Sequence, residues 1–419
     1  MSISYPPTLV SGPVNIIRVE GEIGGIKKIL YLYGDIHIPI QEQTECNDPI
    51  NSLPIAQHLI YMFKACHQNK PDNKYDFFVE YHPIFPVMDW GYGHPSMHIE
   101  NVLKLAKDSF SIDKETAKII RKDVKIVDNV RTHYTDFRAI SIPQSLSIIH
   151  RGLNNITGTP AMYLTSQQVI MIKESLLPFA IFTNIIQKVL VKGIDPNSDL
   201  ELKKDIDWLY DGINNFSVVT RDYISKIRNK YQHEQVKNKI LEILTGHYDK
   251  LLQRRRKSLS ESFTEADTFI NDPVFQDERY LRVKVKTDEL FGIIYRKGGR
   301  TDEQTSKLQT YINKVDDLLE TIKTDPHQMD IYFLMRFLDK TYVGTGILYS
   351  GIAHSMNIII YLIKYFNFRV THASHHSIPI EEINQKVPSM FYYMELGEYL
   401  FPPVKLQCCD MSHFPKFYE

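Results

Sequence analysis

Two apolar stretches with the same ending decide the fold: "KKILYLYGDIH" at residues 27–37 and "GTGILYSGIAH" at residues 344–354. Each is a nearly continuous apolar run, as expected for a strand that is buried on both faces of a sheet. Each then ends in Gly-x-x-His, which places His37 after the first run and His354 after the second. The two stretches therefore predict central strands that carry polar side chains to one edge of a sheet.

The first of these strands has a neighbour just before it in the sequence. The segment "PVNIIRVEGEI", residues 13–23, precedes it across Gly24-Gly25, which is a typical hairpin turn. A helix and two further apolar strands are then expected at 52–66, 75–83 and 124–130. This alternation of strand and helix is typical of an α/β sheet.

The pattern changes near residue 140. Long segments with helical spacing fill the next two hundred residues or so, and strand signals there are few. We therefore predict an α/β fold with a central mixed sheet, an N-terminal hairpin and a large helical insertion. The expected parts are the first part of the α/β core at 1–140, the helical insertion at 141–340, and the second part of the core with the C-terminal tail at 341–419.

The composition limits the partners. The 419 residues carry a formal net charge of −1, so the chain as a whole does not attract nucleic acid or an anionic membrane. The basic run Arg254–Lys257 lies in a predicted helix and is interpreted as a solvated helix face. The most apolar long window, residues 169–191, contains Lys173, Glu174 and Pro178, which argues against a membrane span.

The four cysteines are Cys46, Cys66, Cys408 and Cys409. They form no CxxC motif with a partner pair, so no structural zinc framework is expected. The pattern is typical of a chain from a reducing compartment. The expected location is the cytoplasm, which would be the host cytoplasm or the virion for a viral protein.

Polar clusters follow the predicted strands at matching positions. They are Asp35 with His37, Glu80 with His82, Asp128 with Arg131, and Gly351 with His354. In open α/β sheets, ligands bind where the loops at the carboxyl ends of the strands converge. The sequence therefore predicts one site built from these four strand ends.

The residue types at these ends suit a divalent transition metal. We expect His37, Glu80 and His354 to bind Zn, Mn, Co or Fe, with open positions left for water or substrate. A water bound there would be acidified into a nucleophile. Asp35 is expected as a ligand or as the base that orients His37, and Arg131 as the group that stabilises an oxyanion.

Other residues are expected to support this site. Gly34 and Gly351 lack a Cβ, so the backbone can turn sharply or approach a ligand closely there. Three residues are candidates for contacts behind the ligands: Asp128, His82 and His372.

One interpretation of the first motif is a phosphate-cleaving site. "YLYGDIH" looks like the opening D-x-H motif of calcineurin-like metallophosphoesterases. That family continues with G-D-x-x-D, G-N-H-[ED] and G-H-x-H elements, and none of them occurs in this sequence. The metallophosphoesterase therefore stays a second alternative.

The whole pattern resembles the TraB/Tiki clan, which includes erythromycin esterase-like and ChaN-like proteins. Gly34 and His37 match its first G-x-x-H, Glu80 its glutamate, and Gly351 and His354 its second G-x-x-H. Asp128 and Arg131 resemble its acid/arginine strand, with Asp136 and Arg138 as rivals. The resemblance covers roughly residues 1–140 and 340–376, under half of the chain.

The resemblance implies a metal-dependent hydrolase that acts on an ester or peptide bond of a small-molecule or peptide substrate. The abundance of Ile, Asn, Lys and Tyr resembles proteins of large AT-rich DNA viruses. This suggests the main alternative, a non-catalytic viral structural or host-interaction protein that retains the fold. The sequence carries no signal for an oligomeric state.

Overall fold

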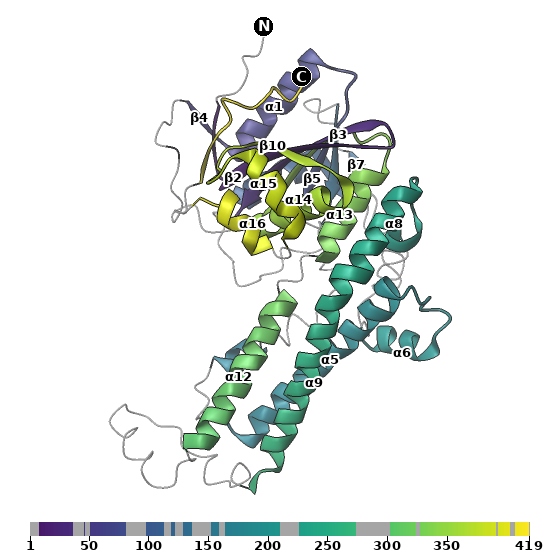
Figure 1. Cartoon of the computed structure of the whole chain (residues 1–419), viewed down its shortest axis with the longest axis vertical. Coiled ribbons are helices and arrows are strands. Elements are labelled where there is room, and N and C mark those ends of the chain that lie inside the picture. Colours follow the sequence, from purple (N-terminus) through teal and green to yellow (C-terminus); the bar gives the residue numbers. More distant parts are fainter. Residues whose placement is uncertain are drawn as a thin grey trace. The chain divides into compact units, whose positions relative to one another are not determined.

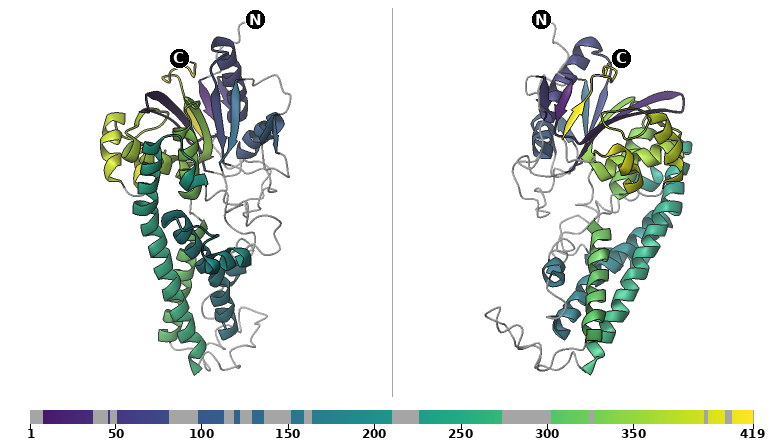
Figure 2. Two further views of the ribbon diagram at one scale, coloured as in Figure 1. Left: turned by 90° about the vertical axis from the view of Figure 1, so that its right-hand side faces the viewer. Right: turned by 60° about the vertical axis from the view of Figure 1, so that its left-hand side comes forward.

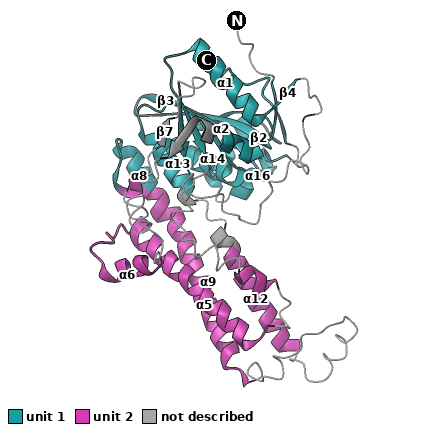
Figure 3. Cartoon of the chain, turned by 180° about the vertical axis from the view of Figure 1, so that it is seen from behind, with its two compact units in different colours: residues 1–139, 229–240, 326–419 teal, residues 140–228, 241–325 magenta. Residues whose placement is uncertain are grey.

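The computed structural model describes residues 8–36, 46, 51–80, 98–112, 119–121, 129–135, 152–158, 164–209, 226–273, 302–323, 327–390, 393–402 and 407–418. The chain forms two compact units (Figure 3). The first unit comprises residues 1–139, 229–240 and 326–419, and the second comprises 140–228 and 241–325. The first unit thus includes 229–240 and 326–340, which the sequence placed in the helical insertion.

The first unit is built on a six-stranded mixed sheet with the order β10-β2-β3-β9-β5-β8. Its strands are β2 (Asn15–Ile23), β3 (Ile26–Asp35), β5 (Tyr75–Val79), β8 (Val130–Tyr134), β9 (Thr345–Gly351) and β10 (Arg369–Ala373). The four strands β3, β9, β5 and β8 run parallel, while β2 pairs antiparallel with β3 and β10 antiparallel with β2. The predicted α/β class is therefore confirmed.

The N-terminal hairpin also forms as predicted. Gly24 and Gly25 connect β2 to β3 with φ values of 57° and 79°, a conformation that side chains with a Cβ rarely adopt. The strand expected at 124–130 differs, because β8 begins only at Val130. Residues 122–128 lie outside the described residues.

Helices cover both faces of the sheet (Figure 1). The helices α1 (Ile55–Asn69) and α2 (His98–Ser109) pack on one face, where their apolar side chains join Tyr31, Tyr33 and Phe77 in one core cluster. The helices α13 (His327–Asp339) and α14 (Ile352–Phe366) lie on the other face. There the ring of Phe78 on β5 meets those of Phe333 and Phe337 on α13.

Short elements complete the first unit. A three-stranded sheet has the order β11-β1-β4, and β6 pairs with β7 in a two-stranded sheet. Their bounds are β1 (Leu9–Ser11), β4 (Ser52–Pro54), β6 (Phe110–Ile112), β7 (Ile119–Arg121) and β11 (Cys408–Asp410). Towards the end of the chain lie α15 (Ile380–Lys386), a 3-10 turn (Val387–Ser389) and α16 (Tyr393–Leu400).

A buried lysine fixes the end of α13. Lys28 on β3 is fully buried, and its Nζ donates hydrogen bonds to the carbonyl oxygens of Phe337, Lys340 and Val343 at 3.2, 2.8 and 2.5 Å. The last carbonyls of a helix have no partner within the helix, so a cation there stabilises it. Burial lowers the pKa of Lys28 to about 8.

The second unit is helical in its described part. Its long helices are α5 (Ser166–Ile186), α9 (Asp249–Asn271) and α12 (Asp302–Lys323), and α9 lies alongside both α5 and α12 (Figure 2). Further elements include α6 (Leu200–Leu209), the π-helical turns Gln187–Val191 and Ile243–Tyr248, and α8 (Glu234–Glu242), which begins in the first unit. In the basic run on α9, Arg254, Arg256 and Lys257 are exposed and Arg255 is half-buried.

One described helical stretch, Ser166–Val191, is long and apolar enough to cross a membrane. Half of its most apolar window is nevertheless buried inside the structure. A core helix passes the same test of length and composition, so this stretch gives no clear evidence of a membrane span.

Candidate functional site

Three of the predicted strand ends lie side by side. Asp35, the last residue of β3, pairs in register with Gly351, the last residue of β9. On the other side of β9, Val79 pairs with Tyr349, and Glu80 follows directly. The parallel register thus brings the ends of β3, β9 and β5 to one edge of one sheet, which is the edge where α/β proteins bind ligands.

Glu80 and His354 are in direct contact at this edge. The Nε2 atom of His354 lies 3.2 Å from Oε1 of Glu80, and the other carboxylate oxygen accepts a hydrogen bond from the backbone N–H of Gly351 at 2.6 Å. Both side chains are buried. The strand-to-helix connection explains the contact, because α14 begins immediately after Gly351 and presents His354 in its first turn.

A second carboxyl group contacts the other nitrogen of the imidazole. Asp330 on α13 is fully buried, and its Oδ1 lies 2.7 Å from Nδ1 of His354. Its Oδ2 accepts a hydrogen bond from Nδ2 of Asn357 at 3.2 Å, one turn further along α14. Two helices therefore fix the orientation of the ring, and the Nδ1 contact fixes which nitrogen faces Glu80.

The charges of this network are coupled. Burial alone lowers the pKa of His354, but the carboxylates of Glu80 and Asp330 outweigh burial and raise the pKa to about 9. Burial raises the pKa of Asp330 to about 6, against the lowering effect of His354 and Asn357. The raised pKa of His354 favours a protonated ring next to the carboxyl groups of Glu80 and Asp330.

Asp35 lies at the same edge with different partners. Its Oδ2 accepts a hydrogen bond from the hydroxyl of Tyr349 at 2.6 Å, and its Oδ1 accepts one from Nε2 of Gln407 at 3.1 Å. Burial and then the carboxylates of Asp35 and Glu80 raise the pKa of Tyr349 well above its ordinary value. The hydroxyl of Tyr349 therefore keeps its proton and donates it in the hydrogen bond to Asp35.

The geometry of Glu80 and His354 fits part of a metal site. Two ligands with bonds of about 2.0–2.2 Å to one ion lie roughly 3–3.5 Å apart, and Oε1 and Nε2 are separated by 3.2 Å. The contact from Nδ1 to Asp330 is the support that metal-binding histidines usually have. Among the described residues, no group of three or more His, Cys, Asp or Glu side chains could hold an ion. His37, the third predicted ligand, lies outside the described residues.

The structure places Arg131 away from this edge. Arg131 is the second residue of β8, and it pairs in register with Asp76 near the start of β5. Its Nε and Nη2 donate to the two oxygens of Asp76 at 2.8 and 2.6 Å, and its guanidinium lies over the ring of Tyr342. The reason is the later start of β8, which puts Arg131 at the opposite end of the sheet from Glu80. Arg131 therefore does not face the candidate site, contrary to our expectation.

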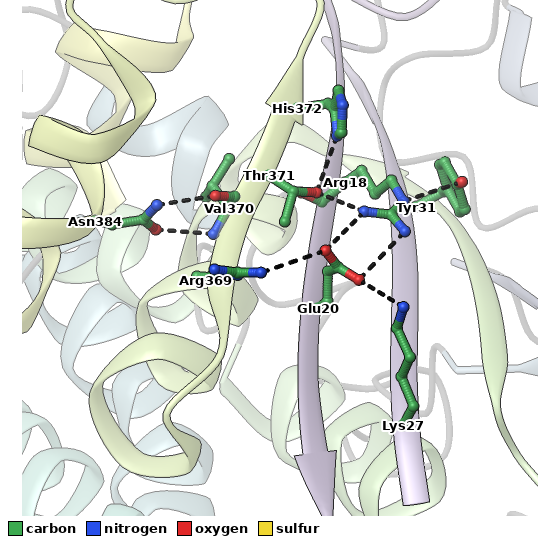
Figure 4. Close-up of polar contacts among 9 residues, drawn as sticks. All are labelled: Arg18, Glu20, Lys27, Tyr31, Arg369, Val370, Thr371, His372 and Asn384. Carbon is green, nitrogen blue, oxygen red and sulfur yellow. Dashed lines mark hydrogen bonds and ion pairs between the residues drawn. The ribbon is translucent and has the colours of Figure 1, made fainter. Parts of the chain in front are cut away.

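His372 is also distant from the pair of candidate ligands. It lies on β10, which β2 and β3 separate from β9. Its Nδ1 lies 3.0 Å from Oγ1 of Thr371, next to the guanidinium of Arg18 (Figure 4). That guanidinium donates to Tyr31, Thr371 and Glu20. Four other residues named from the sequence lie outside the described residues. They are the supporting candidates His82 and Asp128, and the alternative acid and arginine, Asp136 and Arg138.

The two glycines have a role other than a sharp turn. Neither Gly34 nor Gly351 has a positive φ. A Cβ on Gly34 would lie 2.3 Å from Cδ1 of Ile352, so the missing side chain makes room for the start of α14. Gly351 supplies the backbone N–H that binds Glu80. Both glycines therefore help to position α14 and its histidine.

Sequence reasoning missed Asp330, Tyr349 and Gln407. Asp330 lies in the range assigned to the insertion, and Gln407 in a tail without a periodic pattern. The expectation of reduced cysteines was wrong for one pair, because Cys46 and Cys408 form a disulfide across 362 residues. Cys408 belongs to β11, which pairs with β1 at the start of the chain. Spacing alone does not reveal such a long-range pairing.

Comparisons with known proteins relate the chain to a group of viral proteins. The chain is similar to three proteins of Acanthamoeba polyphaga mimivirus: "Uncharacterized protein R706" (28% identity, 98% of this chain and 97% of that protein), "Uncharacterized protein R161" (28%, 98% and 98%) and "Uncharacterized protein R160" (25%, 97% and 96%). The viral origin of these relatives agrees with the resemblance in composition to proteins of large DNA viruses. No solved structure matches the chain. Residues 8–419 match the family of unknown function DUF5847, and the chain belongs to that family.

Proposed function

We propose that the chain is a metal-dependent hydrolase of an ester or peptide bond, with its site at the ends of β3, β9 and β5. The observation that supports this most is the contact between Glu80 and His354 with Asp330 behind it. Neutral imidazole and carboxylate are the donors that Zn, Mn, Co and Fe accept. The resemblance of the two G-x-x-H motifs and Glu80 to the TraB/Tiki clan points the same way.

Each residue of the network has a distinct part in this proposal. Glu80 and His354 would hold the ion, together with His37. The bound ion would supply an acidified water as the nucleophile. Asp330 keeps Nδ1 of His354 protonated, so that Nε2 faces the ion. Tyr349 donates its hydroxyl hydrogen bond to Asp35 and would hold that carboxyl group at the edge of the site.

The proposal requires that His354 gives up its Nε2 proton. In the structure this nitrogen faces Glu80, and the pKa of the ring is raised to about 9. Metal uptake at neutral pH therefore has to release a proton. Isothermal titration in buffers of different ionisation enthalpy measures this release.

One observation favours a second candidate, a non-catalytic viral protein. Both ring nitrogens of His354 and both oxygens of Glu80 already have partners within the protein. A buried polar network that satisfies itself also serves to fix the packing of helices, here of α13 and α14 on the sheet. In that case the protein has no turnover, whether or not it takes up an ion.

Turnover separates the two candidates. The purified chain is loaded in turn with Zn, Mn, Co or Fe(II) and assayed on a panel of carboxylic esters and peptides, with a phosphate monoester as the probe for a phosphoesterase. We expect ester or peptide cleavage that is lost in Glu80→Gln and kept in Glu22→Gln, a change at an exposed glutamate on β2. Metal uptake without turnover, or neither, supports the non-catalytic candidate.

A further inference from the structure

The C-terminal segment of the chain, residues 407–418, packs against the strands that carry the site. Its strand β11 pairs antiparallel with β1, through Leu9 with Asp410 and Ser11 with Cys408. Beyond the strand, the ring of Phe417 lies 3.9 Å from that of Tyr31 on β3. The segment therefore completes the core on the α1 side of the sheet.

The first residue of this segment reaches the candidate site. Gln407 is almost fully buried, and its Nε2 donates to Oδ1 of Asp35 at 3.1 Å and to the carbonyl of Gly12 at 2.5 Å. The backbone carbonyl of Gln407 accepts a hydrogen bond from the N–H of Gly12 at 3.0 Å. Gln407 thus donates a hydrogen bond to one oxygen of the Asp35 carboxyl group, and Tyr349 donates one to the other oxygen.

A disulfide lies directly beside this contact. Cys408, the residue after Gln407, is bonded to Cys46. Cys46 follows Asp35 along the chain, with residues 36–45 between them. The disulfide therefore closes a covalent connection from Asp35 through residues 36–45 to Cys408 and Gln407. His37, the third predicted ligand, lies within this connection.

We infer that the Cys46–Cys408 disulfide is a redox-dependent lock that holds Gln407 against Asp35. The strand pairing of β11 with β1 spans only three residues, which is a short ladder to hold residues 407–418 in place. The disulfide adds a tether at the residue next to Gln407. When it is reduced, the segment opens more often, and Asp35 loses its amide partner.

The redox step balances as thiol–disulfide exchange. The two thiols of Cys46 and Cys408 give up two protons and two electrons and become the disulfide. A low-molecular-weight disulfide such as oxidised glutathione accepts the electrons and is converted to two thiols. Reduction by a dithiol runs the same exchange in reverse. Cys66 and Cys409 are buried free thiols and take no part in it.

A thiol count tests whether the lock exists. Purified protein is denatured and alkylated with and without prior reduction, and the labelled cysteines are identified by mass spectrometry. Without reduction we expect labels on Cys66 and Cys409 alone, and after reduction on all four. Labelling of Cys46 and Cys408 in the unreduced protein, after incubation with oxidised glutathione, overturns the inference.

Hydrogen exchange tests what the lock does. Native protein is compared before and after reduction, alongside Cys408→Ser and the control Cys66→Ser. Loss of a cross-link raises local opening, so the amides of Gly12 and residues 409–411 should exchange about tenfold faster or more after reduction and in Cys408→Ser. Cys66→Ser should behave like the unreduced protein. Equal exchange in the oxidised and reduced protein overturns the inference, and this readout needs no variant to fold.

The disulfide and its effect on hydrogen exchange do not depend on the proposed function. Only the expected effect of the disulfide on metal binding rests on it. Metal affinity is measured on the same oxidised and reduced samples, and reduction should weaken it, because Asp35 at the edge of the site loses its contact with Gln407. If neither sample binds metal, the proposed function fails while the exchange data still decide on the lock. If both bind equally although the segment opens, the lock does not control the site and this part of the inference is refuted.

Discussion

Nε2 of His354 lies 3.2 Å from Oε1 of Glu80, so the first turn of α14 meets the residue that follows β5. The two residues come from distant parts of the chain. They meet because Glu80 follows β5, His354 follows β9, and these two strands pair in parallel. The contact is buried and is completed by Asp330 from α13. This arrangement leads to the following predictions.

Stability should depend on pH through His354. Its pKa is raised to about 9 in the folded protein, above the ordinary value of 6.5, so the folded state retains a proton that the unfolded state loses. The stabilisation is therefore fully present below about pH 6.5 and is lost as the pH rises through about 9, by at most ~3 kcal/mol. Urea unfolding at pH 6.5 and 9 measures it, and His354→Gln should show a smaller loss. An equal loss in that variant contradicts the assignment.

Gly34 should be required for space. In Gly34→Ala the new Cβ would lie 2.3 Å from Cδ1 of Ile352, which should cost about 1–3 kcal/mol of unfolding free energy. Ile352→Val removes Cδ1, so the double variant should be less destabilised than the sum of the two single changes. Denaturant unfolding of all four proteins gives the coupling energy. Simple additivity would show that the contact does not limit the packing of α14.

Two neighbouring lysines should differ sharply. Lys28→Met removes the donor from the carbonyl oxygens of Phe337 on α13 and of two residues just after that helix, and it should cost about 2–4 kcal/mol. Lys27→Met is the matched control, because the Lys27 side chain is 67% exposed and its ion pair with Glu20 should contribute less than about 1 kcal/mol. Urea midpoints compare the two variants. Similar losses would mean that the buried ammonium does not stabilise α13.

Arg131 should matter for stability and not for the site. Arg131→Ala removes the bidentate partner of the buried carboxylate of Asp76 and should cost about 2–4 kcal/mol. Because both residues lie at the opposite end of their strands from Glu80, metal content should not change. Elemental analysis of the folded variant checks this. A loss of metal in a well-folded Arg131→Ala protein would return Arg131 to the site.

The sequence predicted those parts of the fold that depend on local pattern. The apolar runs of β3 and β9, the Gly24-Gly25 turn and the helix at Ile55–Asn69 all follow from residues that are neighbours in the chain. The alignment of Asp35, Glu80 and Gly351 follows from parallel pairing, which carries equivalent strand ends to one edge.

The remaining features depend on contacts between distant segments. A start of β8 only a few residues later than expected moves Arg131 from one end of the sheet to the other. Asp330 meets His354 only because α13 packs beside α14, although its sequence looked like part of a helical insertion. The Cys46–Cys408 disulfide depends on the pairing of β11 with β1. Such pairings leave no short-range signal.

Metal content tests the central claim most directly. Wild-type protein, His354→Ala and the control His376→Ala, which changes an exposed histidine after β10, are loaded with Zn, Mn, Co or Fe(II), desalted and measured by elemental analysis, with folding checked by circular dichroism. We predict about one ion per chain in the wild type and in His376→Ala, and none in folded His354→Ala. Equal metal content in folded His354→Ala, or no retained metal in the wild type, would contradict a metal site at Glu80 and His354.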